Sequence, residues 1–165
     1  MTQLVPMSPE EFRQFVDRNP LEYAASQVRL GIWEEDEAVQ LARAEVAEWL
    51  PQGLDTPDHH FCVIRDEESQ ERVGDLWYCL RPRGRRRQLF VCWVGIDAPH
   101  RRKGHATSVL LEMHAVARRL GAYLVGLGVD ADNVAALSLY TKLGFVPKNI
   151  FLTKPVAPWT STQSG

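Results

Sequence analysis

The segment from Leu89 to Val94 reads Leu-Phe-Val-Cys-Trp-Val and is apolar on both faces. A strand of this kind lies inside a sheet that is covered on both sides. A basic loop follows, and then an amphipathic helix with Val109, Leu110 and Met113 on its apolar face. A buried strand that leads into such a helix predicts an α/β (α+β) fold, a mixed sheet with helices packed on it.

The rest of the chain reads as one domain, residues 1–165, without repeats or a convincing linker. The first helix begins at the capping sequence Ser8-Pro9-Glu10-Glu11. The expected order ααβββαβαβ comprises helices near 9–31, 34–50, 106–120 and 134–142, and strands near 61–65, 73–80, 89–96, 123–129 and 145–153. We expect a helical region over 1–58, a core over 60–154 and a flexible tail over 155–165.

The net charge of −2 conceals two halves of opposite sign. Residues 1–75 contain 17 acidic and 6 basic side chains, whereas residues 76–165 contain 4 acidic and 13 basic ones. The near balance of the total argues against a protein that coats nucleic acid, so we expect no nucleic-acid partner. No apolar run is long enough for a transmembrane helix, and we expect no membrane association.

Cysteine usage indicates the compartment. Cys62, Cys79 and Cys92 are an odd number without CxxC spacing, and all lie in apolar strand-like segments, where buried free thiols are common. The N-terminal sequence has no basic segment followed by an apolar stretch, so no secretory signal is expected. These features favour the cytoplasm; an exported protein with one disulfide is the alternative.

A basic loop, Arg101-Arg-Lys-Gly104-His-Ala106, joins the buried strand to the helix after it. The first N–H groups of a helix lack partners within the helix and can bind an anion. Gly104 lets the backbone approach a ligand closely, and three cationic side chains precede it. The loop predicts an anion site of pyrophosphate size that is neither a Walker loop nor a GxGxxG fingerprint. A basic helix cap without a ligand is the alternative.

A second segment, from Asn133 to Phe145, predicts a helix that Gly144 ends. Asn133, either Ala136 or Leu137, and Tyr140 fall on one face of this helix, where a small residue between two polar ones leaves room for an extended ligand. The alternative is a half-buried tyrosine whose hydroxyl contacts water.

Together the two segments resemble the GNAT superfamily of acyl-CoA N-acyltransferases. Arg101-x-x-Gly104-x-Ala106 is similar to the family's [QR]-x-x-G-x-[GA] pyrophosphate loop. Asn133-x-x-Ala136-x-x-Leu139-Tyr140-x-Lys142-x-Gly144-Phe145 is similar to its second motif. The resemblance covers about residues 60–154, with two departures: Arg102 stands where many members have glycine, and Ala106 is the less common option.

The resemblance implies a GNAT-like mixed sheet and an acetyl-CoA-dependent N-acetyltransferase that acts on a primary amine by direct attack, without a metal. Tyr140 would be the catalytic residue that protonates the departing CoA thiolate. The strand end would pair its backbone with the pantetheine arm, the loop would hold the pyrophosphate, and Asn133 would bond the arm from the other side. The implied acetyl-CoA-binding residues are Val94, Gly95, Ile96, Arg101, Arg102, Lys103, Gly104, His105, Ala106, Thr107, Asn133 and Tyr140.

The general base and the acceptor remain open at this point. Many family members carry a glutamate on the strand before the loop, whereas this strand offers Gly95 at such a position. The candidate bases are Asp75, Asp97, His59, His60 and His100. Acceptor specificity is expected in residues 1–58 and in the Arg81–Arg87 connection, and the acidic first half would lie over the acceptor side. Many relatives pair as dimers, so a homodimer is one option.

Two further functions are kept as alternatives. A non-catalytic acyl-CoA-binding or sensing module would use the same two segments without chemistry. A nucleic-acid-binding protein would use the five arginines of Arg81–Arg87, although a solvated turn is the favoured interpretation because no aromatic residue interleaves them. His59-His60 has no companion ligands at zinc spacing, so no metal site is expected.

Overall fold

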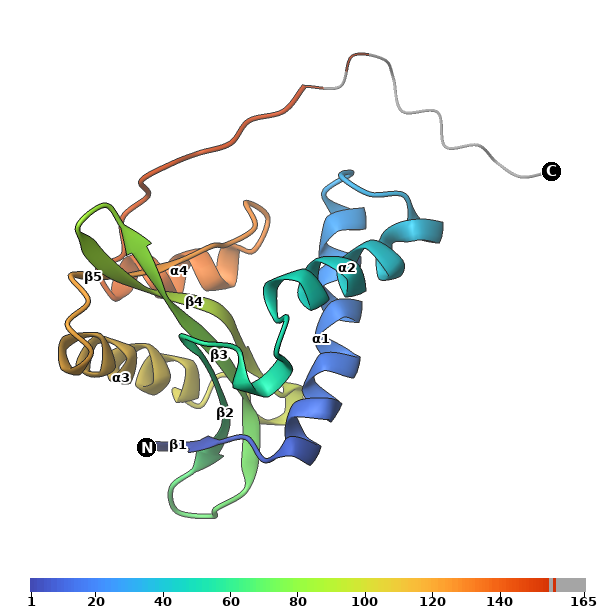
Figure 1. Ribbon diagram of the computed structural model, residues 1–165. Helices are drawn as coiled ribbons and strands as arrows, with labels where there is room; N and C mark the ends of the chain where they lie inside the picture. Colours follow the sequence, from blue (N-terminus) through green and yellow to red (C-terminus); the bar gives the residue numbers. More distant parts are fainter. Residues whose placement is uncertain (155, 157–165) are drawn as a thin grey trace.

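A five-stranded sheet in the order β1-β2-β3-β4-β5 lies at the centre of the computed structural model, which describes residues 1–154 and 156 (Figure 1). Neighbours from β1 to β4 are antiparallel, whereas β4 and β5 are parallel, so the sheet is mixed as predicted. The strands are β1 (Thr2–Pro6), β2 (His59–Asp66), β3 (Arg72–Arg83), β4 (Arg86–Ile96) and β5 (Leu124–Leu127).

Helices cover both faces of this sheet. Figure 1 shows α1 and α2 on one side and α3 on the other. The helices are α1 (Pro9–Arg29), α2 (Glu35–Trp49), α3 (His105–Arg119) and α4 (Val134–Lys142), with short 3-10 turns at η1 (Gly53–Asp55) and η2 (Ala98–His100). The capping box between Ser8 and Glu11 starts α1 as expected: the Ser8 hydroxyl accepts from the Glu11 amide, and the Glu11 carboxylate accepts from the Ser8 amide.

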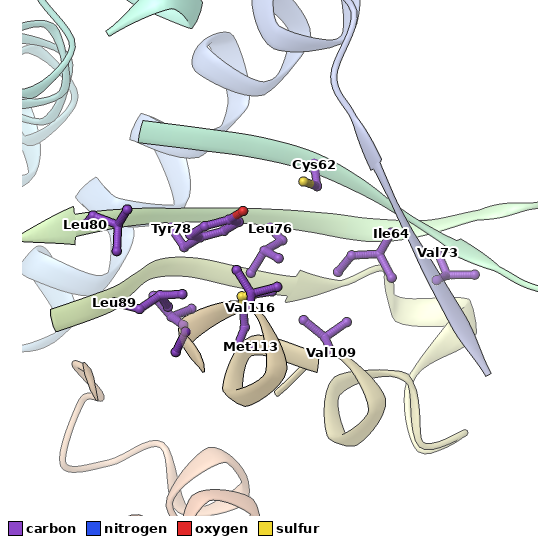
Figure 2. Packing of buried hydrophobic residues seen from close by; sticks show 12 residues of the cluster. Cys62, Ile64, Val73, Leu76, Tyr78, Leu80, Leu89, Val109, Met113 and Val116 are labelled. Atoms are coloured by element: carbon purple, nitrogen blue, oxygen red, sulfur yellow. The ribbon is translucent and has the colours of Figure 1, made fainter. Parts of the chain in front are cut away.

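Successive side chains of a strand point to opposite faces of the sheet, so the hydrophobic core is divided between the two faces. Leu76 and Leu89 point to the α3 side, where Val109, Met113 and Val116 cover them (Figure 2). On the opposite face, the side chains from α1 and α2 pack against aromatic residues of β2 and β3: Phe12, Phe15, Val46, Leu50, Phe61 and Trp77. The central strands are therefore buried on both sides, which explains their unbroken apolar sequence.

The order of the elements differs from the expected ααβββαβαβ at both ends. Residues 2–6 form β1, which was not predicted because five residues carry little periodicity and their strand conformation depends on pairing with β2. The strand expected over 145–153 is absent from the described structure: Pro147 has no N–H to donate, and the segment pairs with no strand. The tail expected to be flexible, 155–165, lies outside the described residues apart from Val156.

Candidate functional site

The two parallel strands β4 and β5 separate halfway along β4. Pairing runs from Gln88 opposite Leu124 to Val91 opposite Leu127 and ends there. Cys92 is an extra residue in the ladder with β3, because Tyr78 pairs with Val91 whereas Trp77 pairs with Trp93. A bulge of this kind bends its strand and increases the local twist. Within the described chain, residues 92–96 therefore present backbone N–H and C=O groups along an edge that no strand covers.

The loop after β4 brings an uncapped helix N-terminus to this open edge. Gly104 is the N-cap of α3 with φ 87°, and no side chain caps the first turn. A Cβ at Gly104 would meet no atom within 4 Å, so the backbone is open to approach. Arg102 also has a positive φ, 65°, which explains why glycine suits this position in many family members.

The cationic side chains of this loop differ in what they contact. The Arg101 Nε donates to the Ile96 carbonyl at 2.8 Å, which ties the loop to the end of β4. Arg102 and Lys103 are exposed and form no ion pair with described residues. The His105 side chain is buried, so this residue can offer a ligand only its amide. The first turn of α3 thus presents amides and positive charge together, as an anion site requires.

A hollow of about 530 Å³ adjoins this turn: Lys103 and Gly104 of the loop line it together with residues of α3, β1 and the β2–β3 turn. Thr107 and Ser108 line it together with Asp66 and Glu68. These two carboxylates would disfavour a phosphate group inside the hollow.

The second motif forms α4 and its exit turn. The Asn133 Oδ1 caps the helix by accepting from the Ala136 amide at 3.1 Å, which leaves the side-chain NH₂ group as a donor. At the other end, Gly144 has φ 84°; its amide donates to Thr141, and the Phe145 amide donates to the Tyr140 carbonyl. These two bonds are a Schellman motif, which needs the left-handed glycine.

The side chain of Tyr140 lies against Phe145 of this exit turn. The Phe145 ring lies 5.8 Å from the Tyr140 ring and 5.8 Å from the His114 ring of α3. Tyr140 is half-buried, and burial raises the pKa of its phenol above the ordinary value. Its hydroxyl therefore keeps its proton at neutral pH and can act as a donor. The contact between Phe145 and Tyr140 was not predicted from the sequence, although the Gly-Phe pair after the helix is a signal for it.

The loop before Asn133 is bound to the C-terminal part of α1. The Arg29 Nε and Nη2 donate to Asp132 at 2.7 Å and to Asp130 at 2.9 Å, and the Ser26 hydroxyl also donates to Asp130. The Arg29 guanidinium holds the pKa of Asp132 below its usual value. The C-terminal end of α1 thus contacts the β5–α4 connection directly, a link between residues about one hundred positions apart that no local pattern predicts.

Comparison with known proteins identifies this arrangement. The sequence profile described as the acetyltransferase (GNAT) family matches residues 23–145. The chain belongs to the GNAT family. It is an N-acetyltransferase, and enzymes of this family use acetyl-CoA and an acceptor substrate.

The relatives extend over nearly the whole chain. The uncharacterised N-acetyltransferases YycN and YdgE of Bacillus subtilis are each 32% identical over 151 residues, which cover 92% of this chain and 96% of theirs. The crystal structure of YycN has a TM-score of 0.88 at 31% identity and covers 95% of this chain and 99% of its own. An acetyltransferase from Pyrococcus furiosus shares the fold, with a TM-score of 0.69 at 18% identity over 94% of this chain and 100% of its own.

In this GNAT enzyme, a side chain at the position where a glutamate was sought would require the Trp93 indole to shift. A Cβ at Gly95 would lie 2.8 Å from the Trp93 indole nitrogen. Asp75 is directly opposite Gly95 across the β3–β4 ladder and is 2% exposed. Its carboxylate accepts from Arg72 at 2.8 Å and also from Arg18. Two guanidinium groups therefore bind the Asp75 carboxylate, which lies across the ladder from Gly95.

The other candidate bases of the GNAT enzyme are also engaged. Asp97 pairs with Arg72 at 3.1 Å, and His100 lies 3.6 Å from Glu71. The His59 Nδ1 accepts from the Trp77 indole at 2.9 Å, so a neutral His59 carries its proton on Nε2. Burial lowers the pKa of both His59 and His60, and the His60 ring stacks on Tyr78. No single residue among the five emerges as the base.

The arginines of the β3–β4 hairpin contact the enzyme itself. The Arg81 guanidinium lies 3.8 Å above the Phe90 ring, and the Arg86 guanidinium lies 5.3 Å from the Tyr123 ring. Arg83 donates to Gln88, and Arg87 pairs with Asp58. These contacts favour the interpretation as a solvated hairpin over a nucleic-acid surface.

In the described part of the GNAT enzyme, no group of three or more His, Cys, Asp or Glu side chains is arranged to hold a metal ion. None of the described helices has the length and hydropathy needed to cross a bilayer.

Proposed function

We propose that this enzyme transfers the acetyl group of acetyl-CoA to a primary amine. One observation carries the proposal: an open backbone edge on β4 runs directly into the uncapped, cationic N-terminus of α3. An extended amide-containing arm that ends in a pyrophosphate has the hydrogen-bonding groups and the charge to match both parts.

The proposed acetyl-CoA contacts follow from these groups. The backbone of Val94, Gly95 and Ile96 would bond the pantetheine arm, and the Asn133 NH₂ group would bond it from the other side. The pyrophosphate would lie against the loop and the first turn of α3, with Arg101 released from Ile96 to face it. The contributing residues are Arg101, Arg102, Lys103, Gly104, His105, Ala106 and Thr107, of which His105 would contribute its amide alone. The proposed reaction requires no metal.

The proposed chemistry is a direct transfer. The neutral amine attacks the thioester carbonyl carbon, a C–N bond forms, and the C–S bond breaks. The departing thiolate takes the proton of the Tyr140 hydroxyl, and a base accepts the proton that the amine loses. The raised pKa of Tyr140 supports this role, because the phenol remains protonated at the pH where a thiolate of pKa about 8.5 leaves. We assign the base to none of the five candidates.

The test is release of CoA thiol from acetyl-CoA across a panel of small, peptide and protein amines. We expect turnover with at least one amine and a higher melting temperature with acetyl-CoA. A melting-temperature shift without turnover on any amine would instead favour the binding or sensing module, in which Tyr140→Phe would change nothing.

The acidic start of α2 offers a test of acceptor charge. Glu34, Glu35 and Glu37 are exposed and lie at the N-terminus of α2. We propose that they raise the local concentration of a cationic amine. Replacing all three with lysine should raise the KM for the amine several-fold at low ionic strength and leave the KM for acetyl-CoA nearly unchanged. Equal changes in both KM values would refute this placement.

We propose one domain over residues 1–165, with 1–58 on the acceptor side and 60–154 as the acyl-CoA-binding core. Three free thiols support action in the cytoplasm.

Exposed apolar side chains after α4 support a homodimer: Val146, Ile150, Phe151 and Leu152. A molar mass equal to that of a single chain, measured by light scattering at micromolar protein concentrations, would contradict the homodimer.

A further inference from the structure

Two cysteines meet on the face of the sheet that α1 and α2 cover. Cys79 of β3 and Cys92 of β4 have their sulfur atoms 3.5 Å apart, and the Cys92 thiol donates to the Cys79 sulfur. Cys79 pairs with Phe90 across the ladder, and Cys92, two residues after Phe90, is the extra residue of the β4 bulge and lies diagonally beside Cys79. The register of the two strands thus brings together two thiols that are 13 positions apart in sequence.

The surroundings favour a thiolate on one of the two sulfurs. The Arg81 Nε donates to the Cys79 sulfur at 3.3 Å, while the same guanidinium lies over the Phe90 ring. The hydrogen bond that the Cys92 thiol donates and the nearby Arg81 guanidinium both lower the pKa of Cys79. The pKa of Cys92 is raised, because its thiol acts as the donor to Cys79 and is also desolvated. A thiolate beside a thiol is the usual arrangement of an oxidisable pair.

Cys62 provides an internal contrast. It belongs to the cluster on the α3 side of the sheet (Figure 2), and burial raises its pKa to about 11. Among the described residues no cation contributes to its pKa, so Cys62 should remain an inert buried thiol.

We propose that Cys79 and Cys92 form a dithiol site that peroxide oxidises to a reversible disulfide. Closure requires the sulfur atoms to approach from 3.5 Å to about 2.05 Å. Cys79 is 2% exposed and Cys92 is half-buried, so the proposal has a small oxidant reach the pair from the Cys92 side, where a bulky disulfide reagent would not fit.

The reaction balances in two steps. The Cys79 thiolate attacks one oxygen of hydrogen peroxide, the O–O bond breaks, and the departing hydroxide leaves as water after it takes a proton. The Cys92 sulfur then attacks the sulfenic sulfur of Cys79, forms the S–S bond and expels a second water. The two thiols lose two electrons and two protons, which reduce one peroxide to two waters. A dithiol reductant reverses the change.

The experiment treats the intact protein with hydrogen peroxide, alkylates the remaining thiols and maps the tryptic peptides. Cleavage separates the three cysteines into peptides 44–65, 73–83 and 88–101. We expect 73–83 and 88–101 to appear joined and two hydrogens lighter, whereas 44–65 carries the alkyl group. Dithiothreitol should restore alkylation at both sites, and an aromatic disulfide reagent should label neither in the native protein.

Two arginine variants test the environment. Arg81→Gln should slow formation of the joined peptide by about tenfold, because the thiolate loses its cation. Arg85→Gln, at the exposed turn of the same hairpin, should leave the rate unchanged. Peroxide that leaves Cys79 and Cys92 alkylatable, joins either of them to Cys62, or oxidises them separately to sulfinic acids would overturn the proposal. Equal rates for the two arginine variants would overturn the role of Arg81.

Discussion

Replacing Tyr140 with phenylalanine should lower kcat by about 10²-fold while the KM for acetyl-CoA changes little, because general acid catalysis contributes roughly 10² to 10⁴ in rate. The hydroxyl is removed and the ring stays against Phe145, so folding should be preserved. In the wild type, kcat should fall at alkaline pH only above the ordinary phenol value near 10, since burial raises the pKa of Tyr140. Steady-state kinetics from pH 7 upward would measure both effects.

Tyr123→Phe is the matched control for this variant. Tyr123 is exposed, and its ring contacts Arg86 on the hairpin. The control should retain the wild-type kcat. A Tyr140→Phe enzyme with undiminished kcat would remove Tyr140 from the chemistry and transfer proton donation to water.

Neutralising the cationic loop should produce the second large effect, on the binding of acetyl-CoA. Substituting glutamine for Arg101, Arg102 and Lys103 together should raise the KM for acetyl-CoA by about tenfold to 10²-fold, because charge-assisted bonds to phosphate are lost. The difference in this KM between the variant and the wild type should become smaller at high salt, because salt also screens the attraction between the wild-type loop and the phosphates. Acetyl-CoA titrations at two ionic strengths would measure this.

Two controls separate anion binding from a general loss of charge. Substituting glutamine for the exposed Arg85, Arg118 and Arg119 changes the net charge equally and should leave the KM unchanged. An acetyl thioester of N-acetylcysteamine has no pyrophosphate, so the loop variant should use it as well as the wild type does. If the loop variant lost activity equally on both thioesters, the loop would not be the pyrophosphate site.

Local signals explain why part of the site could be predicted. The boundaries of α4 were predicted residue by residue because Asn133 caps one end and Gly144 closes the other, and both contacts span a few residues. The buried strand that became β4 was predicted because burial on both faces is visible in its composition. The short strand β1 was not, since it exists through its pairing with β2, about sixty residues away.

Longer-range contacts explain why the rest could not be predicted. Asp75 was a reasonable candidate base in sequence, but Arg18 reaches it from α1, 57 positions away. The bulge at Cys92 depends on the register of two strands, and the sequence of one strand does not specify that register. The fastening of the β5–α4 loop by Arg29 likewise depends on how two distant elements meet.

The ion pairs of Arg29 with Asp130 and Asp132 connect α1 to the start of α4. Arg29 lies on α1, which we propose to be on the acceptor side, and its two carboxylate partners lie on the short connection that starts the helix of Tyr140. A displacement of the C-terminal turn of α1 would therefore shift the helix that carries Tyr140. Under the roles proposed for α1 and Tyr140, substitutions that reshape this turn for a different acceptor would also move the proposed proton donor, and acceptor preference would be coupled to turnover.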